Sequence, residues 1–280
     1  MKQLLLLYTL FLTFYGYTQK TEEQWFEELT DLYYEGDAMT AYLGFGRFVE
    51  KHPKSDLVSR AKLNQGFLLR ALGKDGEAKL IFESILRSKY DEYEAYGGIM
   101  EQFTLYKHRS AKQLAEIALL EKDYNNAGKY IEIFHTVYPY KHFCGNELSA
   151  NEIYTDAMYA KMYHGKGKTK RAVQKLLPHM FFNGLAGNHE IIELLEEYLP
   201  IAFSKEQLSF FLKQSIESFK TRKNGKKAYF TLLDVKISLD AYQLSYMNGI
   251  EVNVEVDETL NQEALRTLFK KHPVWSSYME

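Results

Sequence analysis

Three short stretches of this sequence carry side chains from which phosphate or metal sites are built. Gly165-Lys-Gly-Lys-Thr169 matches the end of a phosphate-binding loop, in which backbone amides and a lysine hold the phosphate. The complete motif needs a glycine at position 162, where this chain has Met162, and a preceding strand, where the pattern favours a helix. We therefore interpret the stretch as a turn between two helices.

The other two stretches are candidate metal sites. His189-Glu190 begins like a zinc-protease helix, but Glu193 occupies the position of the second histidine. His135, His142 and Cys144 could meet around one loop, although their spacing follows no regular ligand pattern. No serine lies in a nucleophile-elbow context. The sequence therefore predicts a protein without a metal, another cofactor or a catalytic site.

The first residues are expected to direct export. Lys2 supplies a positive start, residues 4–17 form an uncharged apolar run, and Gly16 and Thr18 are small enough for a cleavage site. The run suits a signal peptide and is short for a membrane span, which leaves an uncleaved anchor as the alternative. We expect a signal peptide over residues 1–18 and an exported chain in the periplasm, outside the cell or at its surface, with no stable membrane insertion after cleavage.

The composition narrows the classes of partner. The chain has 35 Lys and Arg residues against 37 Asp and Glu residues, so it has no broad electrostatic attraction for nucleic acid. Hydrophobic residues make up 46% of the chain, which is enough for a folded core. Cys144 is the single cysteine, so no intramolecular disulfide can form.

Local signals place the helices and one strand. Ser/Thr-x-x-Gln, the pattern of a capping box, marks four expected helix starts at Thr21–Gln24, Ser110–Gln113, Ser204–Gln207 and Thr259–Gln262. We also expect a helix over 90–107, and we favour a helix over 229–246, where helical and strand periods overlap. Strict alternation predicts a strand over 250–257, paired with 230–239 or with a sheet of another protein.

Small and aromatic residues recur in pairs of these helices. Ala41 to Ala78 and Phe45 to Phe82 are each 37 residues apart, so two helical hairpins repeat one pattern with a short insertion. The repeated positions are Trp25, Ala41, Phe45 and Pro53 in the first copy; Gly66, Ala78 and Phe82 in the second; Ala115, Ala127 and Pro139 in the third; and Ala160, Tyr163 and Ala172 in the fourth. In these positions the chain resembles the tetratricopeptide (TPR) family of 34-residue helix–turn–helix repeats.

The resemblance implies an all-α fold. We expect a TPR-like helical-hairpin solenoid over residues 19–182 and a mostly helical segment over residues 183–280 with a small β element. The implied function is that of a scaffold or adaptor that binds a protein or peptide in the concave groove. An exported enzyme or a glycan-binding protein with its site in the C-terminal region is the alternative.

The same resemblance supplies candidate binding residues on the first helix of each pair. Basic and amide side chains in such positions hold a peptide carboxylate in part of the family. The corresponding residues here are Arg60, Asn64, Arg109 and Lys112. Tyr34 and Phe67 could anchor apolar side chains of the same partner. Solvated surface charges and core aromatics are the alternative interpretation of these residues.

Overall fold

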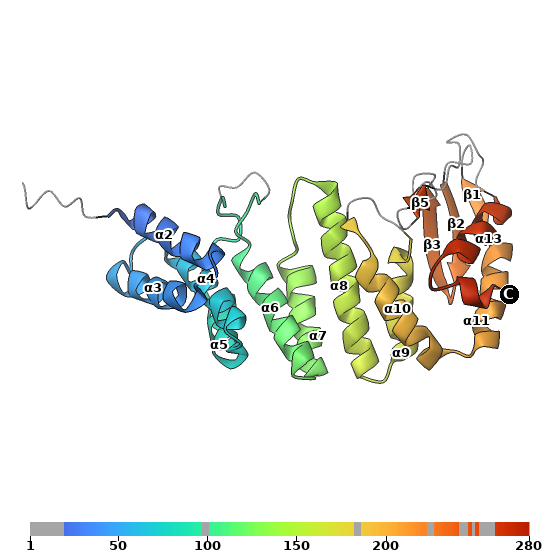
Figure 1. Ribbon diagram of the computed structural model, residues 1–280, viewed down its shortest axis with the longest axis horizontal. Helices are drawn as coiled ribbons and strands as arrows, with labels where there is room; N and C mark the ends of the chain where they lie inside the picture. The colour runs from blue at the N-terminus through green and yellow to red at the C-terminus, as the bar shows by residue number, and fades with distance from the viewer. Residues whose placement is uncertain are drawn as a thin grey trace, which may run out of the picture. The chain divides into compact units, whose positions relative to one another are not determined.

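The computed structural model describes residues 20–96, 101–181, 186–222, 227–240, 246–247, 250–251 and 261–279. Over these ranges the chain is predominantly helical with a small antiparallel β element, as expected (Figure 1). The helices in these ranges are too short or too polar to span a lipid bilayer. The chain divides into two compact units, Met1–Tyr90 and Asp91–Glu280.

The first unit consists of two helical hairpins. Its helices are α2 (Glu22–Tyr34), α3 (Ala38–Lys51), α4 (Val58–Ala71) and α5 (Asp75–Leu86). Each helix packs on the next, and the capping box at Thr21 confirms the predicted start of α2. Gly66 permits the closest approach, because a Cβ there would lie 2.5 Å from Cε1 of the buried Phe82 ring. The predicted close contact between small and aromatic residues is therefore confirmed at this position.

The second unit continues with helices that also pack in sequence. They are α6 (Tyr106–Leu120), α7 (Tyr124–Glu132) with the π-helical turn η1 (Ile133–Val137), α8 (Gly145–Gly165), α9 (Thr169–Leu176) with the 3-10 turn η2 (Leu177–His179), α10 (His189–Ala202) and α11 (Lys205–Glu217). From α6 to α10 each helix contacts the next, and α8 also contacts α6 and α10. The predicted turn between α8 and α9 is confirmed, with Gly167 at a positive φ of 71°.

A hairpin replaces the helix that we expected over residues 90–107. Ala95 and Phe103 form an antiparallel bridge, so the prediction is wrong; the Gly97-Gly98 pair lies outside the described residues. The carboxylate of Glu92 accepts hydrogen bonds from the backbone N–H groups of Lys107, at 2.6 Å, and His108, at 3.2 Å. This carboxylate satisfies two amides of the first turn of α6, and the helix therefore begins before the position that the sequence pattern marks.

Of the remaining predicted helix starts, one is wrong and one is confirmed. Ser110 lies inside α6, so the start predicted at Ser110–Gln113 is wrong, whereas the capping box at Ser204 is confirmed. The last helices are α13 (Gln262–Lys271) and the 3-10 turn η5 (Ser276–Tyr278). Asn261 caps α13 by accepting from the N–H of Ala264 at 2.8 Å, and Thr259 lies outside the described residues.

A three-stranded antiparallel sheet occupies most of the region where we favoured a helix. Its strands are β1 (Lys220–Arg222), β2 (Lys227–Leu232) and β3 (Val235–Asp240), in the order β1-β2-β3. The helix predicted over 229–246 is therefore wrong. Leu233 and Asp234, with φ values of 50° and 64°, form the two-residue turn between β2 and β3. The side-chain amide of Gln174 donates to the carbonyl of Leu233 at 3.0 Å and ties this turn to α9.

The strand predicted over 250–257 is present where it is described. β5 (Ile250–Glu251) pairs with β4 (Tyr246–Met247), and residues 252–257 lie outside the described residues. The expected partner over 230–239 is wrong, because Phe230 pairs with Ile237 within the β2–β3 hairpin.

One hydrophobic core joins α8 and α9 to the C-terminal elements of the second unit. It runs from Ile153 to Trp275 and crosses the boundary that we expected after residue 182. Within this core, buried polar side chains form hydrogen bonds with Met180. The His272 Nε2–H donates to the Met180 carbonyl at 2.9 Å, and the Asn188 side-chain amide donates to the same oxygen at 2.9 Å. His272 Nδ1 accepts from the N–H of Val274, so the ring is neutral with both nitrogens bonded.

Candidate functional site

Lys112, on α6, carries an ammonium that the nearby carboxylates of Glu116, Glu101 and Glu190 stabilise only at a distance. Its ammonium lies 3.7 Å from the centroid of the Tyr154 ring on α8. Among the described residues it has no hydrogen-bond or ion-pair partner. Burial lowers the pKa of Lys112 from its ordinary value, and Glu116 opposes this shift. A half-buried ammonium with three unused donors is suited to receive an anion.

Arg109, one turn before Lys112, is held within the chain. Its Nη2 lies 2.6 Å from Oε2 of Glu101, and its guanidinium lies 5.2 Å from the centroid of the Tyr96 ring. Both partners come from the 91–105 hairpin, so the segment that the sequence misassigned is the one that engages Arg109. Of these two predicted basic residues, Arg109 pairs with a carboxylate of the chain, whereas Lys112 has no such pair among the described residues.

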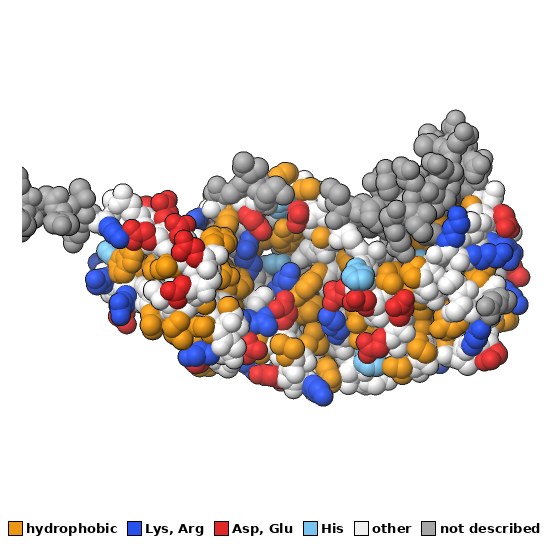
Figure 2. Space-filling model, viewed as in Figure 1, with side chains coloured by type: hydrophobic (Ala, Val, Ile, Leu, Met, Phe, Trp, Pro, Cys, Tyr) orange, Lys and Arg blue, Asp and Glu red, His pale blue; other side chains and the backbone are white. Residues whose placement is uncertain are grey.

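The surroundings of Lys112 form what we call the charged face, made of Arg109, Lys112 and Glu116 on α6, Tyr154 and Lys161 on α8, and Glu190 on α10. The Tyr154 hydroxyl donates to Glu116, and the Lys161 ammonium pairs with Glu190. These contacts bridge the first helices of successive pairs. Basic and acidic side chains intermingle over the helices of the second unit in Figure 2, and no single sign of charge dominates the face in view.

The other predicted binding residues lie in the first unit. Arg60 and Asn64 are half-buried on α4. The Phe67 ring packs edge to face on Phe82 at 5.7 Å between centroids. Tyr34 is 78% exposed and stacks on Tyr33. Phe67 therefore contributes to packing, whereas Tyr34 presents most of its surface to solvent.

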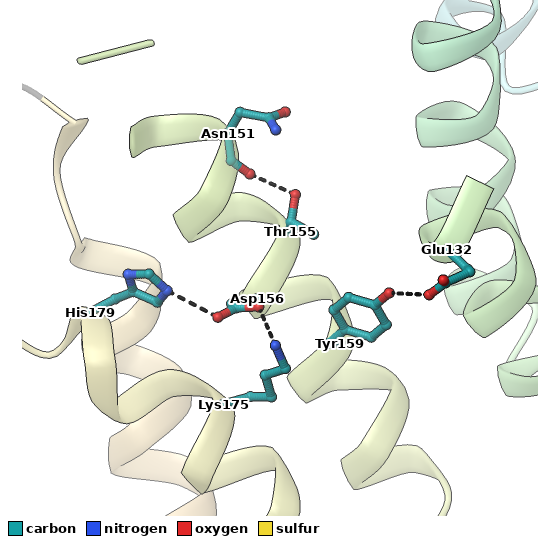
Figure 3. Close-up of polar contacts among 7 residues, drawn as sticks. All are labelled: Glu132, Asn151, Thr155, Asp156, Tyr159, Lys175 and His179. Atoms are coloured by element: carbon teal, nitrogen blue, oxygen red, sulfur yellow. Dashed lines mark hydrogen bonds and ion pairs between the residues drawn. The ribbon is translucent and has the colours of Figure 1, made fainter. Parts of the chain in front are cut away.

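A polar cluster around Asp156 is the feature that sequence reasoning missed (Figure 3). Asp156, on α8, accepts from the Lys175 ammonium at 2.7 Å and pairs with His179 Nε2 at 3.1 Å. Burial favours the neutral acid, but the bonds from His179 and Lys175 prevail and hold the pKa of Asp156 below its usual range. Its partners lie 19 and 23 residues away, and no local sequence pattern marks such a contact.

The Asp, His and Lys side chains of this cluster are types that also occur in catalytic sites, but here they are bonded to one another. The side chain of His179 is 8% exposed, so its imidazole is closed to a substrate. The neighbouring Thr155 hydroxyl donates to the carbonyl of Asn151, one helical turn earlier, as Figure 3 shows. Asp156 therefore fixes η2 and the end of α9 against α8.

Replacing Asp156 with Asn is expected to lower the free energy of unfolding by about 2 kcal/mol, because it removes the charged acceptor of the buried His179 ring and of the partly exposed Lys175 ammonium. Urea unfolding at neutral pH, followed by circular dichroism, measures the change. Glu263→Gln, which removes an exposed pair with Arg266, is the control and should cost less than about 0.5 kcal/mol. Equal losses in the two variants would contradict the structural role of Asp156.

The histidines of the candidate metal sites have other partners. His142 Nδ1 accepts from the N–H of Cys144 at 3.0 Å, and the His135 ring contacts Tyr159. Exposed His189 pairs with Glu193 at 3.2 Å. The described residues contain no group of three or more ligands that could hold a metal ion.

Comparison with protein-family models, with curated proteins and with solved structures gives no match in any of the three.

Proposed function

We propose that this protein is a non-catalytic adaptor whose TPR-like helical hairpins bind a peptide segment of a partner protein along the charged face. The observation that carries this proposal is the ammonium of Lys112, which has no hydrogen-bond or ion-pair partner in the described part of the chain. In the proposed complex a carboxylate of the peptide accepts from Lys112, and the Tyr154 ring holds the lysine in place. In this proposal the protein acts after the export expected from its first residues, in the periplasm, outside the cell or at the cell surface.

The energetics of the charged face support binding as the role of Lys112. An ammonium removed from water without a hydrogen-bond acceptor lowers stability, and a bound carboxylate would restore what is lost. The pairing of Arg109 with Glu101 leaves a single cation for the carboxylate. The neighbouring Lys161–Glu190 pair supplies both signs of charge. The protein should therefore prefer peptides that carry an acidic and a basic side chain at complementary positions.

Selection from a displayed library of peptides with free C-termini tests the proposal. The selected peptides are expected to lose about tenfold or more in affinity for the Lys112→Met variant, because a charge-assisted hydrogen bond contributes about 1.5–3 kcal/mol. Fluorescence polarisation with labelled peptide measures this loss. Methionine preserves most of the apolar stem, so the free energy of unfolding should stay within about 1 kcal/mol of the wild type.

Lys213→Met, which removes an exposed lysine from α11, is the matched control and should leave the affinity unchanged. Amidation of the peptide C-terminus distinguishes a terminal carboxylate from a side-chain carboxylate. Peptides that bind the wild type and the Lys112→Met variant equally would overturn the proposal.

A further inference from the structure

A second feature of the fold, away from the charged face, gathers cations without carboxylates. The turn after α8 and the end of α10, at the lower edge of Figure 1, border a shallow, open cleft of about 590 Å³. It is lined by Gly167, Lys168, Thr169, Lys170, Arg171, Gln174, Ile201 and Ala202. None of these described residues is acidic, although the whole chain has a net charge of −2.

Two of the three cations of this cleft lie over aromatic rings. The Lys170 ammonium lies 5.3 Å from the centroid of the Phe203 ring, and the Arg171 guanidinium lies 4.4 Å from that of Tyr163. A ring orients a cation through its quadrupole but leaves the full charge in place. In the described part of the chain, Lys168, Lys170 and Arg171 have no ion-pair partner. Other cations of the same unit, such as Lys161 and Lys175, do pair with carboxylates.

One wall of the cleft is apolar. Ile201 is 59% exposed, and Ala202 follows it at the end of α10. Gln174 adds an amide whose Nε2 is already bonded to Leu233, which holds that side chain in position. The cleft therefore offers three positive groups opposite an apolar surface, an arrangement that suits an anion attached to an apolar group.

We propose that this cleft binds a phosphate-bearing ligand, with the phosphate between Lys168, Lys170 and Arg171 and the apolar part of the ligand on Ile201. A phosphate monoester carries nearly two negative charges at neutral pH and a phosphodiester carries one, and both accept several hydrogen bonds from ammonium groups and a guanidinium fork. The phosphate can belong to a soluble molecule or to a lipid headgroup. Both sources present anionic phosphate oxygens to the same three cations.

Two probes of the full chain distinguish these sources. Inorganic pyrophosphate, titrated by calorimetry, represents the soluble ligand. Vesicles of phosphatidylglycerol in phosphatidylcholine, compared in a sedimentation assay with pure phosphatidylcholine vesicles, represent the lipid. Binding of at least one anionic probe is expected, and it should weaken as the salt concentration rises. Binding of pyrophosphate alone identifies a soluble source, and binding of vesicles alone identifies a membrane.

Matched variants locate the binding. Lys168→Gln, Lys170→Gln and Arg171→Gln combined should reduce the affinity at least tenfold. Lys213→Gln, Lys270→Gln and Lys271→Gln combined remove the same charge from exposed positions elsewhere and should leave the affinity unchanged. Protection of Lys168 and Lys170 from acetylation by the bound probe, read by mass spectrometry, tests the site in the unmodified sequence.

The proposal is overturned if neither probe binds, if both triple variants lose affinity equally, or if the probe does not protect Lys168 and Lys170. None of these measurements involves Lys112, so they can fail or succeed independently of the peptide-binding function.

Discussion

Acidification to about pH 4 is expected to destabilise the second unit by roughly 3 kcal/mol for each of two buried histidines. Burial lowers the pKa of His108 and the pKa of His272 to about 4, below the ordinary value of 6.5. Their ring nitrogens bond to backbone groups: His108 Nδ1 donates to the carbonyls of Phe134 and Tyr138, and His272 Nε2 donates to that of Met180. Protonation would place a charge in the core.

The direction of this pH dependence follows from the difference in proton binding between the folded and the unfolded chain. The unfolded chain protonates these histidines near pH 6.5, whereas the folded chain does so near pH 4. The stability that depends on the neutral rings is complete above pH 6.5, is lost as the pH falls toward 4, and changes little below that. Glu92 acts in the opposite direction, because burial raises its pKa in the folded chain.

The two tryptophans allow the second unit to be followed separately. Trp25 lies in α2 of the first unit, and Trp275 is fully buried in the second. In a Trp25→Phe variant, urea unfolding followed by fluorescence at several pH values between about 7 and 4 reports the environment of Trp275. Adding His272→Gln should lower stability at neutral pH and reduce the further loss on acidification. An unchanged pH dependence in that variant would show that His272 is not the titrating group.

Gly66→Val is expected to cost about 3 kcal/mol of stability in the first unit. The new Cβ would overlap the Phe82 ring, which is fully buried, so the ring or one of the two helices would have to shift. Since domains are stable by only about 5–15 kcal/mol, this loss should expose α4 and α5 to rapid hydrogen exchange. Exchange measured by mass spectrometry gives both the size and the location of the effect.

Gly76→Ala is the matched control within the same helix pair. A Cβ at Gly76, in the first turn of α5, would meet nothing within 4 Å. Alanine also favours the helix, so this variant should be unchanged or more stable by up to about 1 kcal/mol. Equal destabilisation by the two substitutions would mean that the close approach at Gly66 is not what the glycine provides.

The sequence anticipated those parts of the fold that depend on neighbouring residues. The capping boxes at Thr21 and Ser204, the turn at Gly167 and the small-on-aromatic contact at Gly66 all use groups close in the chain or repeated within one helix pair. The sequence patterns did not predict the β2–β3 hairpin, because its turn residues are Leu233 and Asp234. Both have positive φ, in a turn where Asn-Gly or Asp-Gly is the usual signal. Leu233 is also buried and reads as a core residue of a helix.

Long-range contacts explain what sequence reasoning missed at the candidate site. Glu92 stabilises the first turn of α6 from 15 and 16 residues away, so the start of that helix has no local mark. The same hairpin brings Glu101 to Arg109, which separates the roles of Arg109 and Lys112 although both match the repeat pattern. Lys112 could be proposed from its position in the repeat, whereas its lack of a partner among the described residues depends on the packing of α6 against α8.

The hydrogen bonds that His272 and Trp275 form with Met180 affect how the chain can fold during its translation. His272 and Trp275 reach back 92 and 95 residues to this one residue, so the core of the second unit stays incomplete until Trp275 has been made. The first unit, in which each helix packs on the next, needs no later segment and can fold while the rest of the chain is still being translated. During that interval the chain would consist of a folded first unit followed by a second unit with an incomplete core. A chaperone that binds exposed apolar segments would therefore meet the second unit and not the first.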